Sequence, residues 1–103
     1  MRDKILSFIS LAQKAGKTAC GQFLAEKAIK EGKAYAVIVT KDASDNTKKH
    51  IKDMCAYRDI PCFEYSDKEN LGRTCGKEER SVTAICDTGF ADNIKRLLAE
   101  VES

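Results

Sequence analysis

Residues 69–80, ENLGRTCGKEER, place two glycines and several basic side chains in one short segment. The basic residues are Arg73, Lys77 and Arg80. A nucleotide-binding loop, a tight turn and a loop that contacts RNA phosphates all use such a composition. A P-loop needs four residues between its glycines, followed by Lys and then Ser or Thr. Only three residues separate Gly72 from Gly76, and Glu78 follows the lysine, so we do not expect nucleotide binding.

The side chains that could catalyse a reaction lack the partners that catalysis needs. His50 is the single histidine, and in KKHIKD it belongs to a basic, solvated helix face. Asp42 follows a predicted buried strand, as a phospho-accepting aspartate would, but no acidic pair accompanies it near the N-terminus. Cys20 precedes a predicted helix start, where a thiolate is stabilised, but no histidine is near it in the sequence. We therefore expect no enzymatic activity.

The five cysteines argue against both a metal centre and a disulfide scaffold. Their number is odd, no C-x-x-C pair exists, and only one histidine is present, so a zinc site lacks ligands. No segment has the pattern of an export signal, and disulfides are typical of exported proteins. We expect reduced thiols that act as small apolar residues, with no metal and no cofactor. The cysteines are Cys20, Cys55, Cys62, Cys75 and Cys86.

The distribution of charge along the chain is more informative than the net charge of +2. Residues 1–52 contain 11 Lys and Arg against 5 Asp and Glu, and residues 53–103 contain 7 against 11. The balances of +6 and −4 suggest a surface that faces a polyanion, although scattered surface charge would give the same totals. If the loops that carry the basic residues meet at one sheet edge, helix N-termini there would add N–H groups for phosphate. The candidate contacts are Lys14, Lys17, Lys27, Lys41, Lys48, Arg73, Lys77 and Arg80.

Alternating helix and strand patterns are expected to position these groups. Helices are predicted over 3–15, over 22–31, up to about Tyr57, after a Ser66 cap and after an Asp87 cap. Strands are predicted over 17–20 at most, 34–39, 62–65 and 81–86. This alternation indicates one α/β domain over residues 1–103, with helices on both faces of a small sheet. The apolar runs are too short to cross a membrane, so we expect a cytoplasmic protein.

Three segments resemble one known family. They are GQFLAEKAIKEGKAYAVIVTKDAS (21–44), CAYRDIPCF (55–63) and ENLGRTCGKEER (69–80). Over about residues 5–99 the chain resembles the L7Ae/L30e superfamily of ribosomal proteins, in particular its small bacterial members of the YlxQ type. The resemblance implies a three-layer α/β/α sandwich with a mixed sheet of four strands. It also implies binding of structured, kink-turn RNA in association with the ribosome, and we expect a monomer that binds neither DNA nor a membrane.

The resemblance also implies which residues contact RNA. Gly21 matches the glycine that opens the RNA-binding helix, and Lys27 matches a lysine on that helix. A second contact loop matches residues 75–80. Its candidate contacts are Cys75, Gly76, Lys77 and Arg80. Typical kink-turn binders follow the glycine with Thr, then often Asn and Glu, and the last two read paired guanines. This chain has Gln22, Phe23 and Leu24 there. Gln22 can still hydrogen-bond to RNA, but the two apolar side chains cannot read a base edge.

Two interpretations of Phe23 stay open. It is either an apolar residue packed into the fold or an exposed platform on which an extruded base stacks. An alternative function also stays open, a protein-interaction module that keeps the fold and presents Phe23 and Leu24 as an apolar patch. RNA binding predicts a continuous positive surface beside Gly21 and a steep salt dependence. A protein module predicts a flat apolar patch and little salt effect.

Overall fold

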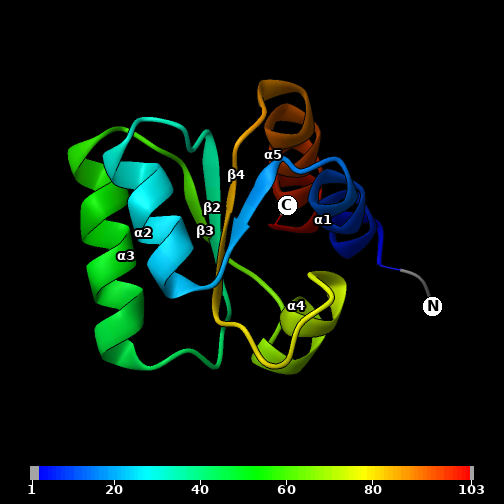
Figure 1. Ribbon diagram of the computed structural model, residues 1–103, viewed down its shortest axis with the longest axis horizontal. Coiled ribbons are helices and arrows are strands. Elements are labelled where there is room, and N and C mark those ends of the chain that lie inside the picture. Colours follow the sequence, from blue (N-terminus) through cyan, green and yellow to red (C-terminus); the bar gives the residue numbers. More distant parts are fainter. Residues whose placement is uncertain (1–2, 103) are drawn as a thin grey trace.

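The alternating pattern produces one layer of strands with helices packed on both of its faces (Figure 1). This computed structural model describes residues 3–102. The helices in that range are α1 (Lys4–Lys14), α2 (Gln22–Lys30), α3 (Asp45–Tyr57), α4 (Lys68–Thr74) and α5 (Thr88–Glu102). The strands are β1 (Thr18–Cys20), β2 (Ala36–Val39), β3 (Cys62–Glu64) and β4 (Val82–Ile85). The predicted α/β/α sandwich with a mixed sheet is confirmed.

The strand directions decide which loops meet. The order across the sheet is β1-β4-β2-β3, and β4 is antiparallel to both of its neighbours while β2 and β3 are parallel. Therefore β1, β2 and β3 all run the same way, and their carboxyl ends lie at the edge where β4 begins. We call this part of the molecule, at the bottom of Figure 1, the loop edge. It consists of residues 21–22, 40–44, 65–67 and 75–81.

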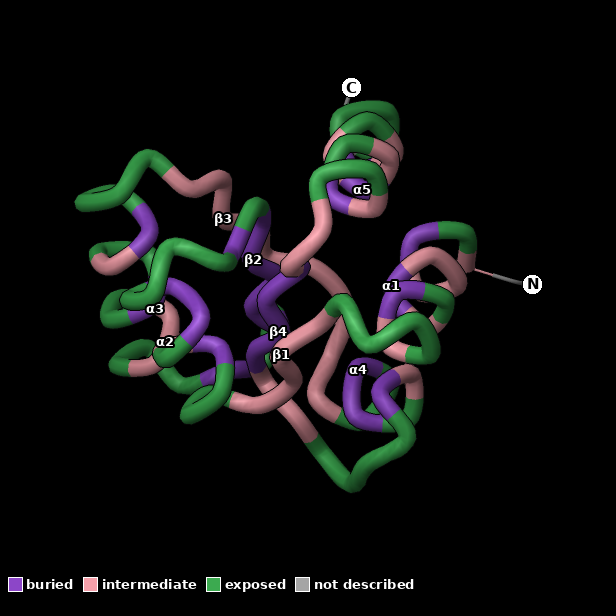
Figure 2. Tube along the Cα trace, turned by 45° about the horizontal axis from the view of Figure 1, so that its top comes forward, coloured by how far each residue is buried: buried purple, intermediate pink, exposed green. Residues whose placement is uncertain are grey.

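Side-chain alternation along the strands divides the core into two parts. Val37 and Val39 pack with α2 and α3 on one face of the sheet. Ala36 and Ile38, one position out of step, pack with α1, α4 and α5 on the other. Both central strands, β2 and β4, are buried along their whole length (Figure 2). A central strand covered on both faces needs an apolar residue at nearly every position, which explains the continuous AVIV run.

Several helix starts are set by side-chain caps. The Asp3 carboxylate accepts a hydrogen bond from the Leu6 N–H (3.0 Å), and the Asp87 carboxylate accepts one from the Phe90 N–H (3.0 Å), as predicted. The predicted Ser66 cap is wrong by one residue. Asp67 caps α4, because Ser66 has a φ of +62° and turns the chain before the helix begins. Among the helices of residues 3–102, none combines the length and the apolar character that a bilayer crossing needs.

Candidate nucleic-acid interface

α2 begins at the loop edge with a glycine whose backbone conformation is rare for other residues. Gly21 has a φ of +102°, which glycine adopts without steric cost. Its N–H donates to the Val82 carbonyl oxygen (2.8 Å) and ties the helix start to β4. No side chain caps α2, and its first turn contains no acidic residue. The first turn therefore presents unpaired N–H groups and the positive end of the helix dipole, which together attract an anion.

Arg80 connects the loop before β4 to the start of α2. A Cβ atom added to Gly21 would lie 3.5 Å from Cδ of Arg80 and 3.6 Å from its Nε. The arginine side chain thus lies against the glycine. Its Nη1 donates to the Glu79 carbonyl oxygen (2.8 Å). No carboxylate among residues 3–102 forms an ion pair with it. The guanidinium group therefore lies beside the α2 N-terminus without a carboxylate partner in the described residues.

The segment that follows α4 folds back against that helix. A Cβ atom on Gly72 would lie only 1.9 Å from the Glu78 carbonyl oxygen, so only glycine allows this approach. The Lys77 N–H donates to the Gly72 carbonyl oxygen (2.8 Å), and the Arg80 N–H donates to that of Lys68 (3.1 Å). These contacts leave the Lys77 side chain exposed. The ENLGRTCGKEER segment (69–80) therefore forms the end of a short helix and a loop that packs against this helix. Its last arginine lies at the start of α2.

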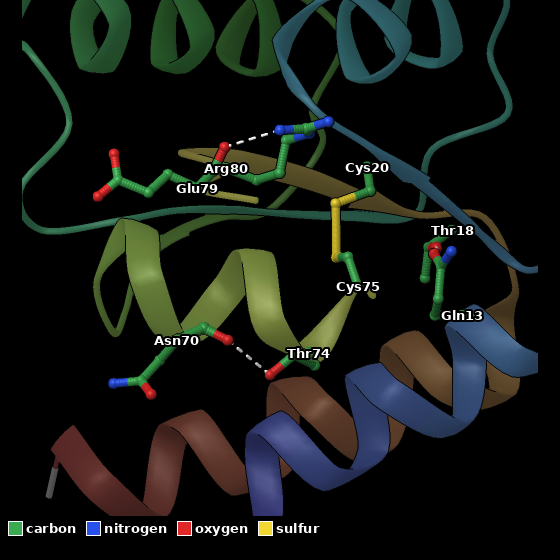
Figure 3. The surroundings of a disulfide bond; sticks show 8 residues. All are labelled: Gln13, Thr18, Cys20, Asn70, Thr74, Cys75, Glu79 and Arg80. Atoms are coloured by element: carbon green, nitrogen blue, oxygen red, sulfur yellow. Dashed lines mark hydrogen bonds between the residues drawn. A yellow bond between two sulfur atoms is a disulfide. The ribbon is translucent and has the colours of Figure 1, made fainter. Parts of the chain in front are cut away.

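A disulfide joins the end of β1 to the segment that follows α4 (Figure 3). It links Cys20, the last residue of β1, to Cys75, the residue after α4, across 55 positions of sequence. The prediction that all the cysteines are reduced thiols is wrong for this pair, because the fold brings two distant segments to a Cα separation of 6.6 Å. Cys75 is only 2% exposed. Its predicted RNA contact is therefore corrected, since its side chain joins the two segments and faces inward.

Gln22, predicted as an RNA contact, is exposed but already hydrogen-bonded within the protein. Its amide nitrogen donates to the Glu26 carboxylate (3.0 Å), and its amide oxygen accepts from the Thr47 hydroxyl (3.4 Å). Glu26 also lies 3.3 Å from the His50 Nε2. Burial raises the pKa of the Glu26 carboxyl, but the hydrogen bonds from Gln22 and His50 and the charge of His50 outweigh it and lower that pKa overall. The amide links α2 to α3.

Lys41 and Lys48 follow β2, as predicted, but only Lys48 has its charge paired with a carboxylate of the described residues. Lys41 is exposed and forms no ion pair among residues 3–102. The Lys48 ammonium lies 3.5 Å from the Glu64 carboxylate, which also pairs with Lys52. The hydrogen bond from Lys52 lowers the pKa of the Glu64 carboxyl. Lys41 is therefore the stronger candidate for binding an external anion.

Three predicted contacts do not reach this surface. Lys14 and Lys17 lie at the opposite edge, because β1 starts there, and the Lys17 carbonyl oxygen accepts from Cys86 at the end of β4 (2.7 Å). Arg73 pairs with Glu69 (2.9 Å) and lines a hollow between α4 and α1. Of the other predicted contacts, Arg80 lies against Gly21, whereas Gly76, Lys77 and Lys41 belong to loops at the same edge of the sheet and Lys27 lies one turn into α2.

Comparison with known proteins identifies the family. Residues 3–95 match the model of the ribosomal protein L7Ae/L30e/S12e/Gadd45 family. The chain belongs to this family. RNA-binding protein YlxQ of Enterococcus faecium is 41% identical over 94% of this chain and 93% of its own length. That of Bacillus subtilis is 40% identical, over 87% and 90%. A solved structure of a Bacillus halodurans protein of unknown function matches with a TM-score of 0.91 and 34% identity, over 95% of this chain and 99% of that one.

This member of the L7Ae/L30e family exposes two apolar side chains at the first turn of α2. Phe23 is 80% exposed and Leu24 is 50% exposed. The interpretation of Phe23 as a packed core residue is therefore wrong. The ring instead stands on the surface next to the loop edge, two positions after Gly21.

Sequence reasoning missed two features of the site, the disulfide and the link from Gln22 to Glu26 and His50. The signal for the second was present, because Gln22 and Glu26 are four residues apart on a helix and such pairs face each other. No comparable signal exists for Cys20 and Cys75, whose pairing depends on how α4 packs on the sheet.

Proposed function

We propose that this protein is a non-catalytic RNA-binding protein of the bacterial cytoplasm that recognises structured, kink-turn-like RNA at the loop edge. Membership of a ribosomal protein family and the naming of two relatives as RNA-binding proteins support this. The observation that carries it is the placement of Arg80 against Gly21. A sharply bent RNA brings several phosphates close together, and the loop edge offers cations and helix N–H groups within one surface. Association with the ribosome is part of the proposal.

Binding would depend on a rigid surface more than on a change of shape. The α2 N-terminus and the Arg80 guanidinium would hold one phosphate, because N–H groups and a guanidinium both suit its oxygens. Lys77 and Lys41, which are exposed on neighbouring loops, would contact the strand on either side. Lys27 would reach a further phosphate along the exposed side of α2. The disulfide keeps the two main contact segments at a constant spacing.

The test compares basic residues at the two edges of the sheet. In filter binding with a kink-turn hairpin, Lys27→Ala, Lys77→Ala and Arg80→Ala should each weaken binding several-fold. Each should also reduce the slope of log affinity against log salt by about 1, because one phosphate contact is lost. Lys17→Ala is the matched control, since Lys17 is exposed at the opposite edge, and it should bind like the wild type.

The RNA itself supplies a second control. The same hairpin with its bulge deleted forms a straight duplex and should bind at least tenfold more weakly. Equal affinity for both hairpins would contradict the kink-turn part of the proposal. Unchanged affinity of all three alanine variants would contradict the proposed binding surface.

A protein-interaction module is the second candidate function, favoured by the exposed Phe23 and Leu24. It predicts that the wild type shows only weak RNA binding, with little dependence on salt.

A further inference from the structure

The exposed ring of Phe23 lies on the same side of α2 as two lysines. Phe23, Lys27 and Lys30 stand four and three residues apart, a spacing that places side chains along one side of a helix. Together with Glu26 and Glu31 they line a surface hollow of about 290 Å³. An aromatic side chain followed by cations along a groove is the arrangement used to bind single-stranded nucleic acid. The ring is therefore not an isolated exposed residue.

The other side chains of this first turn offer less for recognising a base. The Gln22 amide already donates to Glu26 and accepts from Thr47, so it keeps only part of its hydrogen-bonding capacity, and Leu24 has no hydrogen-bonding group. A phenyl ring at 80% exposure can stack on a base without any rearrangement of the core. The Arg80 side chain lies against Gly21, which is two positions before Phe23 in the sequence. Under the proposed function, Arg80 holds the adjacent phosphate.

We propose that Phe23 stacks on an unpaired nucleobase of the bound RNA, while Lys27 and Lys30 contact phosphates of the same strand. This inference rests on the proposed function and names how the site recognises its RNA. Stacking accepts any base, because every base has a π face. Changing the identity of the unpaired base should therefore change the affinity little, whereas removing that base should lower the affinity strongly.

The first measurement is a double-mutant cycle between the ring and the base. Phe23→Ala should lower the affinity for the kink-turn hairpin about tenfold or more, the range expected when an aromatic stacking contact is removed. An abasic residue at one unpaired position should lower wild-type affinity by a similar factor. That abasic RNA should bind Phe23→Ala no worse than the intact RNA does, because both changes remove the same contact. Additive losses at every unpaired position would overturn the proposal.

Two further substitutions separate stacking from general apolar burial. Phe23→Tyr keeps an aromatic ring and should bind within about twofold of the wild type. Phe23→Leu keeps apolar area without a ring and should lose most of what Phe23→Ala loses. Because the side chain is 80% exposed, none of these variants leaves a cavity in the core. Wild-type affinity in Phe23→Leu would contradict stacking and favour a generic apolar contact.

Fluorescence gives an independent readout, because the chain contains no tryptophan. Trp emission in Phe23→Trp should be quenched on saturation with the hairpin, since a stacked base quenches indole. Tyr57→Trp is the matched control: Tyr57 is 83% exposed but ends α3 away from the loop edge, so its emission should not change. Unchanged emission of Phe23→Trp in the saturated complex overturns stacking alone. Failure of the wild type to bind any of these RNAs overturns the proposed function as well.

Discussion

Gly72 has no room for a side chain, because the Glu78 carbonyl oxygen occupies the place of its Cβ atom, 1.9 Å away. The obstacle is backbone, so no rotamer change can relieve it. We expect Gly72→Ala to lower the free energy of unfolding by about 3 kcal/mol, as overpacking of a tight site does. Urea denaturation measures this.

Glu69→Ala on the same helix is the control for Gly72→Ala. Glu69 is exposed, and its ion pair with Arg73 is a surface pair, so its loss should change stability by less than about 1 kcal/mol. Because the clash pushes residues 77–80 away from α4, Gly72→Ala should also weaken RNA binding. A variant as stable as the wild type would contradict the close approach.

Tyr65 is the residue whose titration should be visible in the stability of the fold. Its hydroxyl donates to the Asp3 carboxylate (2.5 Å), and burial together with this hydrogen bond raises its pKa to about 12. The ordinary value is about 10, so the native state favours the neutral phenol. The stability that Tyr65 contributes is complete below pH 10 and is lost as the pH rises from about 10 to 12.

Comparison with Tyr65→Phe isolates that contribution. At pH 8 the wild type should be more stable by about 1 kcal/mol, the net value of one hydrogen bond. Near pH 12 the difference should have shrunk towards zero, because the ionised phenol no longer donates to Asp3. Urea denaturation of both proteins at the two pH values measures the difference. A gap that stays constant or widens with pH would contradict the assigned hydrogen bond.

At the scale of elements, the disulfide holds α4 to β1. Cys20 and Cys75 close a loop of 55 positions, and cross-links of this length stabilise by about 2–4 kcal/mol, chiefly by restricting the unfolded chain. A reductant should therefore lower the free energy of unfolding of the wild type by that amount. It should have no effect on a Cys20→Ala/Cys75→Ala variant. Cys86→Ser, which alters a free thiol, should respond to reductant like the wild type.

The elements themselves could be read from the sequence, and their meeting points could not. The Asp3 and Asp87 caps follow from the residue types that favour helix starts. The AVIV strand follows from its continuous apolar run, which indicates burial. The expected grouping of Lys14 and Lys17 with the other basic residues is wrong, because periodicity does not reveal which end of β1 faces which loop. The position of Arg73 beside the hollow between α4 and α1 was also not predictable, since a helix of seven residues shows no clear apolar stripe.

At the scale of the whole molecule, the basic candidates divide between the two edges of the sheet. The excess of positive charge in residues 1–52 includes Lys41 and Lys27 near the loop edge and Lys14 and Lys17 at the far edge. Charge totals therefore indicated a polyanion partner but not its location. The location depends on β4 running against its neighbours, which returns residues 75–81 to the start of α2.

The strands at the two edges of the sheet are short. Its outer strands, β1 and β3, are three residues long each, so a second copy finds little unpaired backbone on which to add a strand. Long exposed strands act as templates for aggregation, and short ones discourage it. Aggregation by adding a strand to either edge of the sheet is therefore disfavoured.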